Sequence, residues 1–317
     1  MKNCLPWLAL LVSFAVHAQT YPSKPVHVII PSAAGAPPDV MARAMAPMLQ
    51  QAMGQPFVVE NRVGANGILG MEAFSKSAPD GYTLLVANGA PVTLNQFFYT
   101  KLPYDSRELA PIINIGVIAA AIAAHVSVPA NGFKELIELA KQKPDTIIWG
   151  TWGSGSFSDL YRAWAQNSYS VVFRDVPYKT PDQAMNALVA GEVNVLLNTP
   201  GLFAPHVKAG KLKALATIGP RRSPHLPDTP SFGELGIDLD FRGWVCAFGP
   251  PGTPADIVQK MNAEFGRLVR DPAFVAKFLT PASVEAAGGT PEEFAVFLRK
   301  DRETAARLTK LANVKLQ

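Results

Sequence analysis

The sequence has little cysteine and little excess charge. Its 317 residues contain two cysteines, and the formal net charge at pH 7 is only +4. Cys4 lies just before the N-terminal apolar run, within the segment expected to be removed, so a processed chain would keep only Cys246 and could form no internal disulfide. Cys246 stands inside the apolar run 244–248, which is typical of a buried structural thiol. No basic run and no basic stripe with interleaved aromatic residues is present, so we expect no nucleic-acid partner.

Motifs for catalysis and cofactor binding are missing as well. The sequence has no GxGxxG or GxxxxGK(S/T) phosphate-binding motif, no HExxH zinc motif and no GxSxG nucleophile motif. The histidines beyond residue 18 are too scattered for a metal site: His27, His125, His206 and His225. Most carboxylates fall on the expected solvent faces of helices. We therefore expect no metal, no cofactor and no enzyme activity.

Long hydrophobic runs are confined to two places. Lys2 precedes an apolar run at 5–16 that ends in small residues, which is the pattern of a secretory signal peptide. Residues 1–18 are therefore predicted to be removed on export to the periplasm. The second run, 112–128, lies between two prolines and is too short and too alanine-rich for a membrane span. We interpret it as a buried strand that crosses from one domain to the next.

Strand-like and helix-like segments alternate along most of the chain, which favours α/β layers with mainly parallel sheets. The expected strands are 26–30, 57–60, 83–87, 146–149, 171–176, 193–198 and 214–218, and the expected helices are 39–53, 66–77, 133–142, 157–167, 181–190, 201–209, 254–270, 272–279 and 291–310. Residues 241–248 form a second apolar crossing. This order predicts a discontinuous first lobe, 19–121 plus 243–317, and an inserted second lobe, 122–242, joined by two crossing strands that form a hinge.

Helix starts carry recognisable capping signals. Thr253-Pro254 and Thr290-Pro291 each predict a threonine N-cap followed by proline as the first helical residue. Ser156 or Ser158 is expected to cap the helix that begins near residue 157.

Four loops rich in small or hydroxyl residues follow strands and precede helix starts. Ligands of open α/β sheets bind beyond the carboxyl ends of strands, where N–H groups at helix starts attract anions. The candidate ligand-binding residues in the first lobe are Ser32, Ala33, Ala34, Gly35, Ala36 and Asp39 in the first loop, and Asn88, Gly89, Ala90 and Thr93 in the second. Those in the second lobe are Trp152, Gly153, Ser154, Gly155 and Ser156 in the third loop, and Asn198 and Thr199 in the fourth. Taken alone, the first loop is equally compatible with an ordinary strand–helix connection, but two loops in each lobe would line a cleft from both sides.

Several strings of the sequence occur together in one known family. They include GQPFVVENRVGANGILG at 54–70, APDGYTLL at 78–85, PHVKAGKLKALA at 205–216, RRSPHLPDTPSFGELG at 221–236 and GGTPEEFAVFL at 288–298. With these motifs the chain resembles the Bug or TctC type of extracytoplasmic solute receptor of the tripartite tricarboxylate transporter family. The resemblance implies a type II periplasmic-binding-protein fold, in which two α/β lobes joined by two crossing strands close on a small ligand. It also implies a small carboxylate ligand (a di- or tricarboxylate or an aromatic acid) and a membrane permease as partner.

Departures from the family pattern bear on the ligand. Amino-acid-binding members commonly carry an aspartate where this chain has Asn198. An asparagine cannot neutralise an ammonium group, so we expect a ligand without a free amine. Trp152 and Phe157 would either stack on a ring of the ligand or pack against the protein. Arg242 would either reach a longer carboxylate or lie exposed at the hinge.

The expected function is capture of a small carboxylate by a monomeric periplasmic receptor that passes it to a permease. One alternative is a receptor that reports its ligand to a membrane sensor kinase. The other is an enzyme on the same fold, which would need a nucleophile–base pair or a metal cluster in the cleft.

Overall fold

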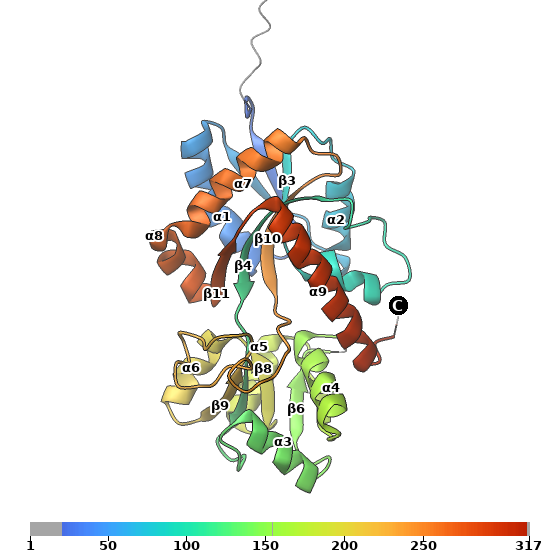
Figure 1. Ribbon diagram of the computed structural model, residues 1–317, viewed down its shortest axis with the longest axis vertical. Coiled ribbons are helices and arrows are strands. Elements are labelled where there is room, and N and C mark those ends of the chain that lie inside the picture. Colours follow the sequence, from blue (N-terminus) through green and yellow to red (C-terminus); the bar gives the residue numbers. More distant parts are fainter. Residues whose placement is uncertain (1–20, 154, 316–317) are drawn as a thin grey trace, which may run out of the picture.

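The computed structural model describes residues 21–153 and 155–315, which form two halves joined in the middle (Figure 1). Each half contains one β-sheet with helices packed on it. We call the upper half lobe 1 and the lower half lobe 2. The expected signal peptide, 1–18, and Ser154 of the third loop lie outside the described residues. None of the described helices is long and apolar enough to cross a membrane.

The sheet of lobe 1 has six strands in the order β11-β4-β10-β3-β1-β2. Its strands are β1 (Val26–Ile30), β2 (Phe57–Asn61), β3 (Thr83–Asn88), β4 (Ala110–Ile118), β10 (Trp244–Gly249) and β11 (Val284–Gly288). Apart from exposed His27, strand β1 is apolar and buried on both sides, as expected for a sheet covered on both faces. Val28 belongs to one buried core with Met45 of helix α1 (Pro37–Met53), whereas Ile29 belongs to another with Phe74 of helix α2 (Ile68–Ser75).

The sheet of lobe 2 has five strands in the order β7-β6-β8-β5-β9. Its strands are β5 (Ala121–His125), β6 (Ile148–Thr151), β7 (Arg174–Pro177), β8 (Val195–Asn198) and β9 (Leu212–Thr217). Trp149 at the centre of β6 is fully buried, as a strand residue covered by helices should be.

Five strands of the lobe 1 sheet, β4-β10-β3-β1-β2, correspond in order to β9-β5-β8-β6-β7 of lobe 2, and only β11 has no counterpart among the described strands. In lobe 1, β1 is parallel to β2 and β3, and β10 runs antiparallel to β3 and β4. In lobe 2, β6 is parallel to β7 and β8, and β5 runs antiparallel to β8 and β9. The expectation of mainly parallel sheets was therefore only partly right. The first strand after each passage between the lobes, β5 or β10, is antiparallel to its neighbours in the sheet. The periodicity of a sequence carries no information about the direction of a strand within its sheet.

The helices fill the intervals between strands. They are α1 (Pro37–Met53), α2 (Ile68–Ser75), α3 (Phe133–Gln142), α4 (Phe157–Tyr169), α5 (Pro181–Ala190), α6 (Pro200–Lys208), α7 (Ala255–Arg270), α8 (Pro272–Phe274) and α9 (Pro291–Leu311). Thr290 caps α9 in a capping box with Glu293, and Ser156 caps α4, both as predicted. The prediction for Thr253 was wrong: its hydroxyl donates to Pro250 O, and Pro254 is the N-cap of α7.

Two passages connect the lobes. The run 112–128 is two strands, β4 in lobe 1 and β5 in lobe 2, interrupted at Ala119-Ala120. The return passage is irregular from residue 218 to 243 and becomes strand only at β10, so the expected strand over 241–248 begins three residues later. The lobe boundaries at 121/122 and 242/243 remain a prediction that agrees with where these passages lie.

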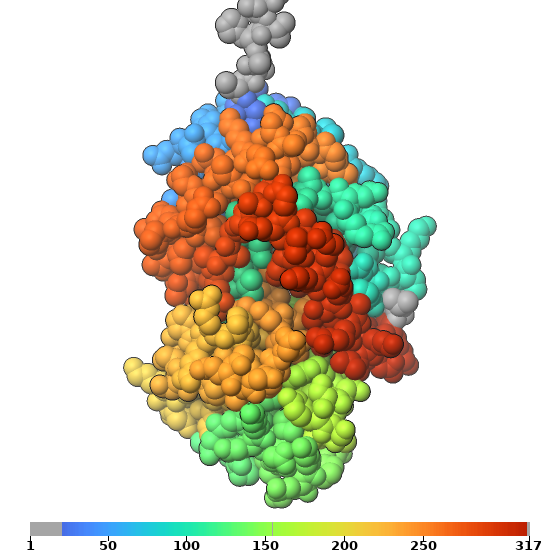
Figure 2. All heavy atoms as spheres, viewed as in Figure 1, coloured from blue at the N-terminus to red at the C-terminus, as the bar shows by residue number. Residues whose placement is uncertain are grey.

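Helix α9 makes a further contact between the lobes. It starts on the sheet of lobe 1, where Phe294 and Leu298 join the core, and it runs toward lobe 2 (Figure 1). Near its end, Ala305 and Leu308 belong to the core of lobe 2, and Leu311 O accepts a hydrogen bond from Asn167 Nδ2 of α4 at 3.2 Å. In Figure 2 the red atoms of this helix lie against the yellow-green atoms of α4.

Candidate functional site

Two neighbouring cavities lie between the lobes, each lined by residues of both. The first, of about 290 Å³, is lined by Asn66, Ala90, Leu94, Phe98, Tyr99, Trp152, Gly155, Ser156 and Phe157. The second, of about 330 Å³, is lined by Asn88, Gly89, Ala90, Ile118, Ala119, Ala120, Trp152, Phe157, Pro181, Leu197, Asn198, Thr199 and Gly243. Both are in the size range of small-molecule sites. They share three lining residues, so together they form one interlobe cleft.

The cleft lies beyond the carboxyl ends of strands that occupy equivalent places in the two sheets. The second loop follows β3 and the fourth follows β8, and both strands end in an asparagine: Asn88 and Asn198. Each asparagine is followed within three residues by a proline at a helix start, Pro91 or Pro200. The third loop follows β6, the strand that corresponds to β1. The sequence-based expectation of loops in matching positions on two lobes agrees with this topology.

The second loop is fixed by buried hydrogen bonds to its backbone carbonyl groups. It turns into a short helical segment, Ala90–Leu94, in which Thr93 is buried and its hydroxyl donates to Gly89 O at 3.0 Å. The hydroxyl of Tyr104 donates to Pro91 O at 2.7 Å. Because a Cβ at Gly89 would stand 2.7 Å from the Trp244 ring, only glycine allows this close approach. The backbone around Ala90 is thus rigidly presented to the cleft.

The third loop approaches lobe 1 closely. Ser156 Oγ accepts the Asp159 N–H at the start of α4. Gly155 has a left-handed backbone, with φ of +76°, and a Cβ there would lie 2.2 Å from Phe98 of lobe 1. A side chain at residue 155 would therefore push the lobes apart or displace the Phe98 ring.

The fourth loop carries an unsatisfied donor. Asn198 is 8% exposed, and its Oδ1 accepts the Thr199 N–H at 2.8 Å. Its Nδ2 is buried and has no hydrogen-bond partner among the described residues. Since unpaired buried donors are costly, an acceptor from a ligand or from water is expected at this point of the cleft.

The first and third loops share one stabilising arrangement. In lobe 1, Gly35 N–H donates to Asp39 Oδ2 at 2.9 Å, and Arg43 Nε donates to the other oxygen at 2.9 Å. In lobe 2, Gly155 N–H donates to Asp159 Oδ2 at 2.8 Å, and Arg162 donates to its other oxygen at 2.6 Å. In both lobes, a carboxylate in the first helical turn fixes the loop before it, and an arginine one turn later holds the carboxylate.

Asp39 is occupied by these contacts. Burial raises the pKa of its carboxyl, but hydrogen bonds from Gly35, Asn61 and Arg43 outweigh burial, so the pKa lies below its ordinary value. The carboxylate therefore stays ionised and engaged with the protein, in a position suited to shaping the loop.

The structure brings eight of the candidate residues to the cleft: Asn88, Gly89, Ala90, Trp152, Gly155, Ser156, Asn198 and Thr199. The remaining described candidates line neither cavity: Ser32, Ala33, Ala34, Gly35, Ala36, Asp39, Thr93 and Gly153. The whole first loop belongs to this second group. The alternative of an ordinary strand–helix connection therefore stays open for it.

Sequence reasoning missed several lining residues, chiefly Asn66, Phe98 and Tyr99. Asn66 has a left-handed backbone, with φ of +53°, inside the glycine pair Gly64–Gly67. Its Nδ2 donates to Asn95 Oδ1 at 2.8 Å, which ties this turn to the second loop. The asparagine between glycines was a usable signal for an unusual turn. No local pattern marks the two aromatic residues, which reach the cleft through the tertiary fold.

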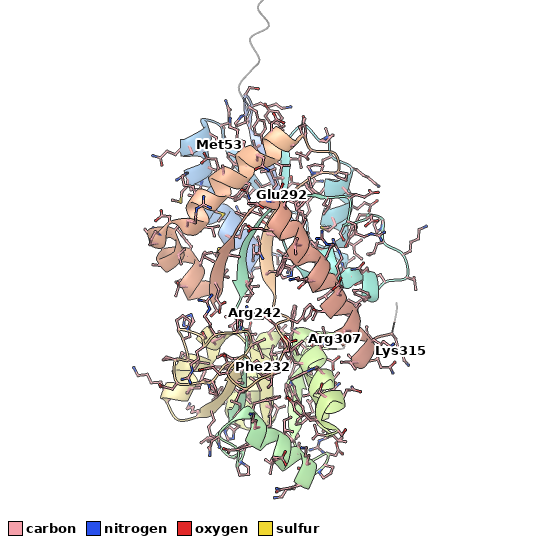
Figure 3. The ribbon with its side chains drawn as sticks, viewed as in Figure 1. Met53, Phe232, Arg242, Glu292, Arg307 and Lys315 are labelled. Carbon is pink, nitrogen blue, oxygen red and sulfur yellow. The ribbon has the colours of Figure 1, made fainter. Side chains whose placement is uncertain are left out.

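Arg242 lies between the halves but outside both cavities (Figure 3). Of the two alternatives for Arg242, exposure at the hinge is wrong, because only 8% of its side chain is exposed, and contact with a longer carboxylate stays a prediction. Arg242 Nε donates to Asp240 at 2.6 Å, and its Nη1 donates to Glu285 at 2.8 Å. Glu285 lies in β11 of lobe 1, so this ion group joins the return passage to the sheet of lobe 1.

The cleft has no charged lining among the described residues. Neither cavity is lined by a lysine, arginine, histidine, aspartate or glutamate. Across the described chain, no group of three or more histidine, cysteine or acidic side chains is placed to hold a metal ion. Beside backbone amides, the described lining offers three asparagines, three hydroxyls and one indole N–H: Asn66, Asn88, Asn198, Ser156, Thr199, Tyr99 and Trp152. Such groups bind by hydrogen bonding and supply no strong acid or base.

Comparisons with known proteins agree with this architecture. Residues 41–314 match the model of the tripartite tricarboxylate transporter family receptor, TctC. A UPF0065 protein of Bordetella bronchiseptica is 31% identical over 98% of this chain and 92% of its own length. Protein BugT of Bordetella pertussis is 30% identical over 94% of each chain.

Solved structures of similar proteins extend the comparison to three dimensions. A TctC solute-binding protein from Polaromonas matches with a TM-score of 0.81 at 26% identity, over 93% of this chain and 99% of the other. The Rhodopseudomonas palustris proteins Rpa4515, solved with adipate, and MatC, solved with malate, match with TM-scores of 0.77 and 0.70. They are 25% and 26% identical and cover 94% and 92% of this chain, with all of their own length. The chain belongs to the TctC family of solute-binding receptors of tripartite tricarboxylate transporters.

Proposed function

We propose that this protein is a periplasmic receptor that captures a small carboxylate in the cleft between its lobes for uptake by a tripartite tricarboxylate-type transporter. The observation that carries the proposal is the composition of the cleft: equivalent strand ends from two lobes present amides and hydroxyls to a shared cavity. The adipate and malate of the two Rhodopseudomonas structures support an acid as ligand.

The energetics favour binding by closure of both lobes. A charge-assisted hydrogen bond contributes about 1.5–3 kcal/mol, and a micromolar complex needs about 8 kcal/mol. Association and ordering consume part of the gain, so donors from one loop are too few. Donors from the second, third and fourth loops together are sufficient. Asp39 and Thr93 would act by holding loops in shape.

Release to a membrane permease and signalling to a sensor kinase are both compatible with such a receptor. We favour transport because the family is named for it. Enzyme activity is the weaker alternative, since the described lining of the cleft contains no histidine, carboxylate, lysine or thiol, and Tyr99 is its one ionisable side chain. A turnover assay with the identified ligand, read by mass spectrometry, would recover the ligand unchanged if the protein only binds.

The ligand class is tested with purified protein from which bound ligand has been removed by unfolding and refolding. A ligand that binds only the folded state raises the melting temperature. Small carboxylates should raise it, whereas nucleotides and sugars should not. Mass spectrometry of the small molecule that co-purifies with untreated protein gives an independent answer. A co-purified sugar or nucleotide, with stabilisation by the same compound, would overturn the proposal.

A further inference from the structure

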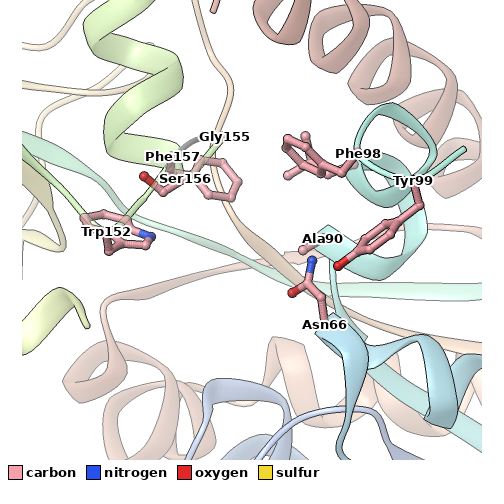
Figure 4. Close-up of a pocket in the computed structure, with 9 residues that line it drawn as sticks. Asn66, Ala90, Phe98, Tyr99, Trp152, Gly155, Ser156 and Phe157 are labelled. Atoms are coloured by element: carbon pink, nitrogen blue, oxygen red, sulfur yellow. The ribbon is translucent and has the colours of Figure 1, made fainter. Parts of the chain in front are cut away.

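Four aromatic side chains converge on the first cavity from opposite lobes (Figure 4). Phe98 and Tyr99 belong to lobe 1, and Trp152 and Phe157 belong to lobe 2. All four are only partly buried. Figure 4 places the two pairs on opposite sides of an open space, with Asn66 beside Tyr99. One face of the Phe157 ring already stacks on Phe241 at a centroid distance of 5.2 Å, so packing explains part of its position. The facing pairs remain available to a flat apolar body inserted between them.

The absence of charged lining residues limits how much charge a ligand can bring. Each carboxylate that leaves water needs its own set of donors, because an uncompensated buried charge is strongly unfavourable. The described lining contains no cation, so a second and third carboxylate would depend entirely on amides and hydroxyls. An ammonium group would be worse placed, since no carboxylate is among the described residues that line the cleft. One negative charge on an otherwise apolar ligand fits this lining best.

Asn198 marks where the acid end would lie. Its Oδ1 is held by the Thr199 N–H, which leaves Nδ2 as the free end of the amide. That nitrogen is buried without a partner in a residue that lines the larger cavity, beside the start of α6. A carboxylate here would satisfy the orphaned donor and would also meet the positive end of the helix dipole.

The size of the cleft is compatible with a ring that carries a short acidic arm. A dry cavity of about 150 Å³ is enough for benzene. The larger cavity measures about 330 Å³ and is lined largely by apolar groups, including Ile118, Leu197 and Pro181. The ring would occupy the first cavity, of about 290 Å³, and the acidic arm would extend into the larger one.

We infer that the ligand is an aromatic, or similarly flat and apolar, monocarboxylate without an amine. Its ring lies among Phe98, Tyr99, Trp152 and Phe157, and its carboxylate is bound at Asn198 Nδ2. This inference rests on the proposed function and narrows it to one subclass of acids. Trp152 and Phe157 act as specificity-determining residues, and Asn198 selects against amines.

Isothermal titration calorimetry of refolded, ligand-free protein tests the inference with matched probes. The key pair is 3-phenylpropanoate and phenylalanine, which differ by one ammonium group. Benzoate, benzamide, succinate and citrate complete the panel. We expect 3-phenylpropanoate or benzoate to bind most tightly. Phenylalanine should bind at least roughly a hundredfold more weakly, because its ammonium group would be buried unpaired. Benzamide should bind more weakly than benzoate, because it lacks the charge that strengthens hydrogen bonds to the amides.

Two pairs of variants locate the binding groups. Phe157→Leu removes a ring from the cleft, and Phe278→Leu makes the same change at a residue that lines neither cavity. Only the first should weaken binding of 3-phenylpropanoate, while succinate binding should not change. Asn198→Leu removes the donor, and Asn198→Asp adds like charge beside the ligand. Both should weaken acid binding, and the aspartate should do so by at least about tenfold more than the leucine. Circular dichroism and melting curves check that each variant folds.

The outcomes separate this inference from the function on which it rests. If succinate or citrate binds at least tenfold more tightly than the aromatic acids, the inference fails and the carboxylate receptor stands. If no probe acid binds and the co-purified molecule is a sugar or nucleotide, both fail. Equal affinity for 3-phenylpropanoate and phenylalanine, or unchanged affinity in both Asn198 variants, would also overturn the inference.

Discussion

Asp301 gives the sharpest stability prediction, because it is an acid for which the effect of burial outweighs that of its polar partners. It lies on α9, is 7% exposed, and has one carboxyl oxygen without a hydrogen-bond partner. Burial raises its pKa from 3.8 to about 6, although the side chains of Thr93 and Trp244 and the charge of Arg302 oppose the rise. The negative charge of Asp240 adds slightly to it. The folded protein therefore binds this proton more tightly than the unfolded chain does.

The sign of the pH dependence follows from that difference. Below pH 3.8, Asp301 is protonated in both the folded and the unfolded state, so its titration does not affect stability. Between pH 3.8 and about 6, it ionises in the unfolded chain but stays protonated in the folded protein, so ionisation favours unfolding. The contribution to stability is thus lost on going from acidic to neutral pH. A shift of about two pKa units corresponds to about 3 kcal/mol, of which about 2 kcal/mol falls between pH 4 and pH 7.5.

Replacement of Asp301 by asparagine removes the titration while keeping a neutral side chain of the same shape. Urea unfolding at several pH values between 4 and 7.5, followed by tryptophan fluorescence, gives the difference in stability between variant and wild type. As the pH rises from 4 to 7.5, the stability of Asp301→Asn relative to wild type should increase by about 2 kcal/mol. A cost of the amide that does not depend on pH would shift the whole profile without changing this increase. Glu303→Gln, an exposed change on the same helix, should show no such trend. Parallel pH profiles for Asp301→Asn and wild type would refute the reasoning.

Four further predictions follow from the contacts described above. Arg242→Ala should cost about 1–2 kcal/mol in urea unfolding, because the buried guanidinium loses its hydrogen bonds to two half-exposed carboxylates; no loss would mean that the ion group adds no stability. Asp39→Ala should cost about 2 kcal/mol by leaving the Gly35 N–H without its acceptor, with Arg62→Ala, an exposed ion-pair partner, as a near-neutral control. Thr290→Ala should cost about 1 kcal/mol through loss of the α9 capping box, again measured by urea unfolding. Burial raises the pKa of the Cys246 thiol well above its ordinary value, so a thiol reagent should label it only in denaturant; rapid labelling of folded protein would contradict this.

The alternation of strands and helices was predictable because each element carries its own periodicity and its own caps. Val26–Ile30 and the Thr290-Pro291 start are examples in which local chemistry decides the structure. The antiparallel entry of β5 and β10 was not predictable in the same way. Strand direction within a sheet depends on which distant segments pair, and no local pattern of residues records that choice.

The candidate site likewise contains residues that local sequence patterns predict and residues that only the tertiary fold brings together. Strand ends followed by glycine, serine or proline revealed the second, third and fourth loops, since small residues and helix starts mark places where a ligand can approach backbone amides. Phe98 and Tyr99 escaped notice because an aromatic residue after a short helix looks like any core residue. Arg242 was misplaced for a related reason: its two acidic partners come from positions 2 and 43 residues away, and only the fold brings the second one near.

The course of α9 has a consequence for any attempt to produce lobe 2 by itself. A fragment of residues 122–242 would lack Ala305, Leu308 and Leu311, which cover apolar surface on α4. That surface would then face water, and the fragment should be prone to self-association. A separate peptide of residues 291–315 should bind to this surface on α4 and restore the solubility of the fragment.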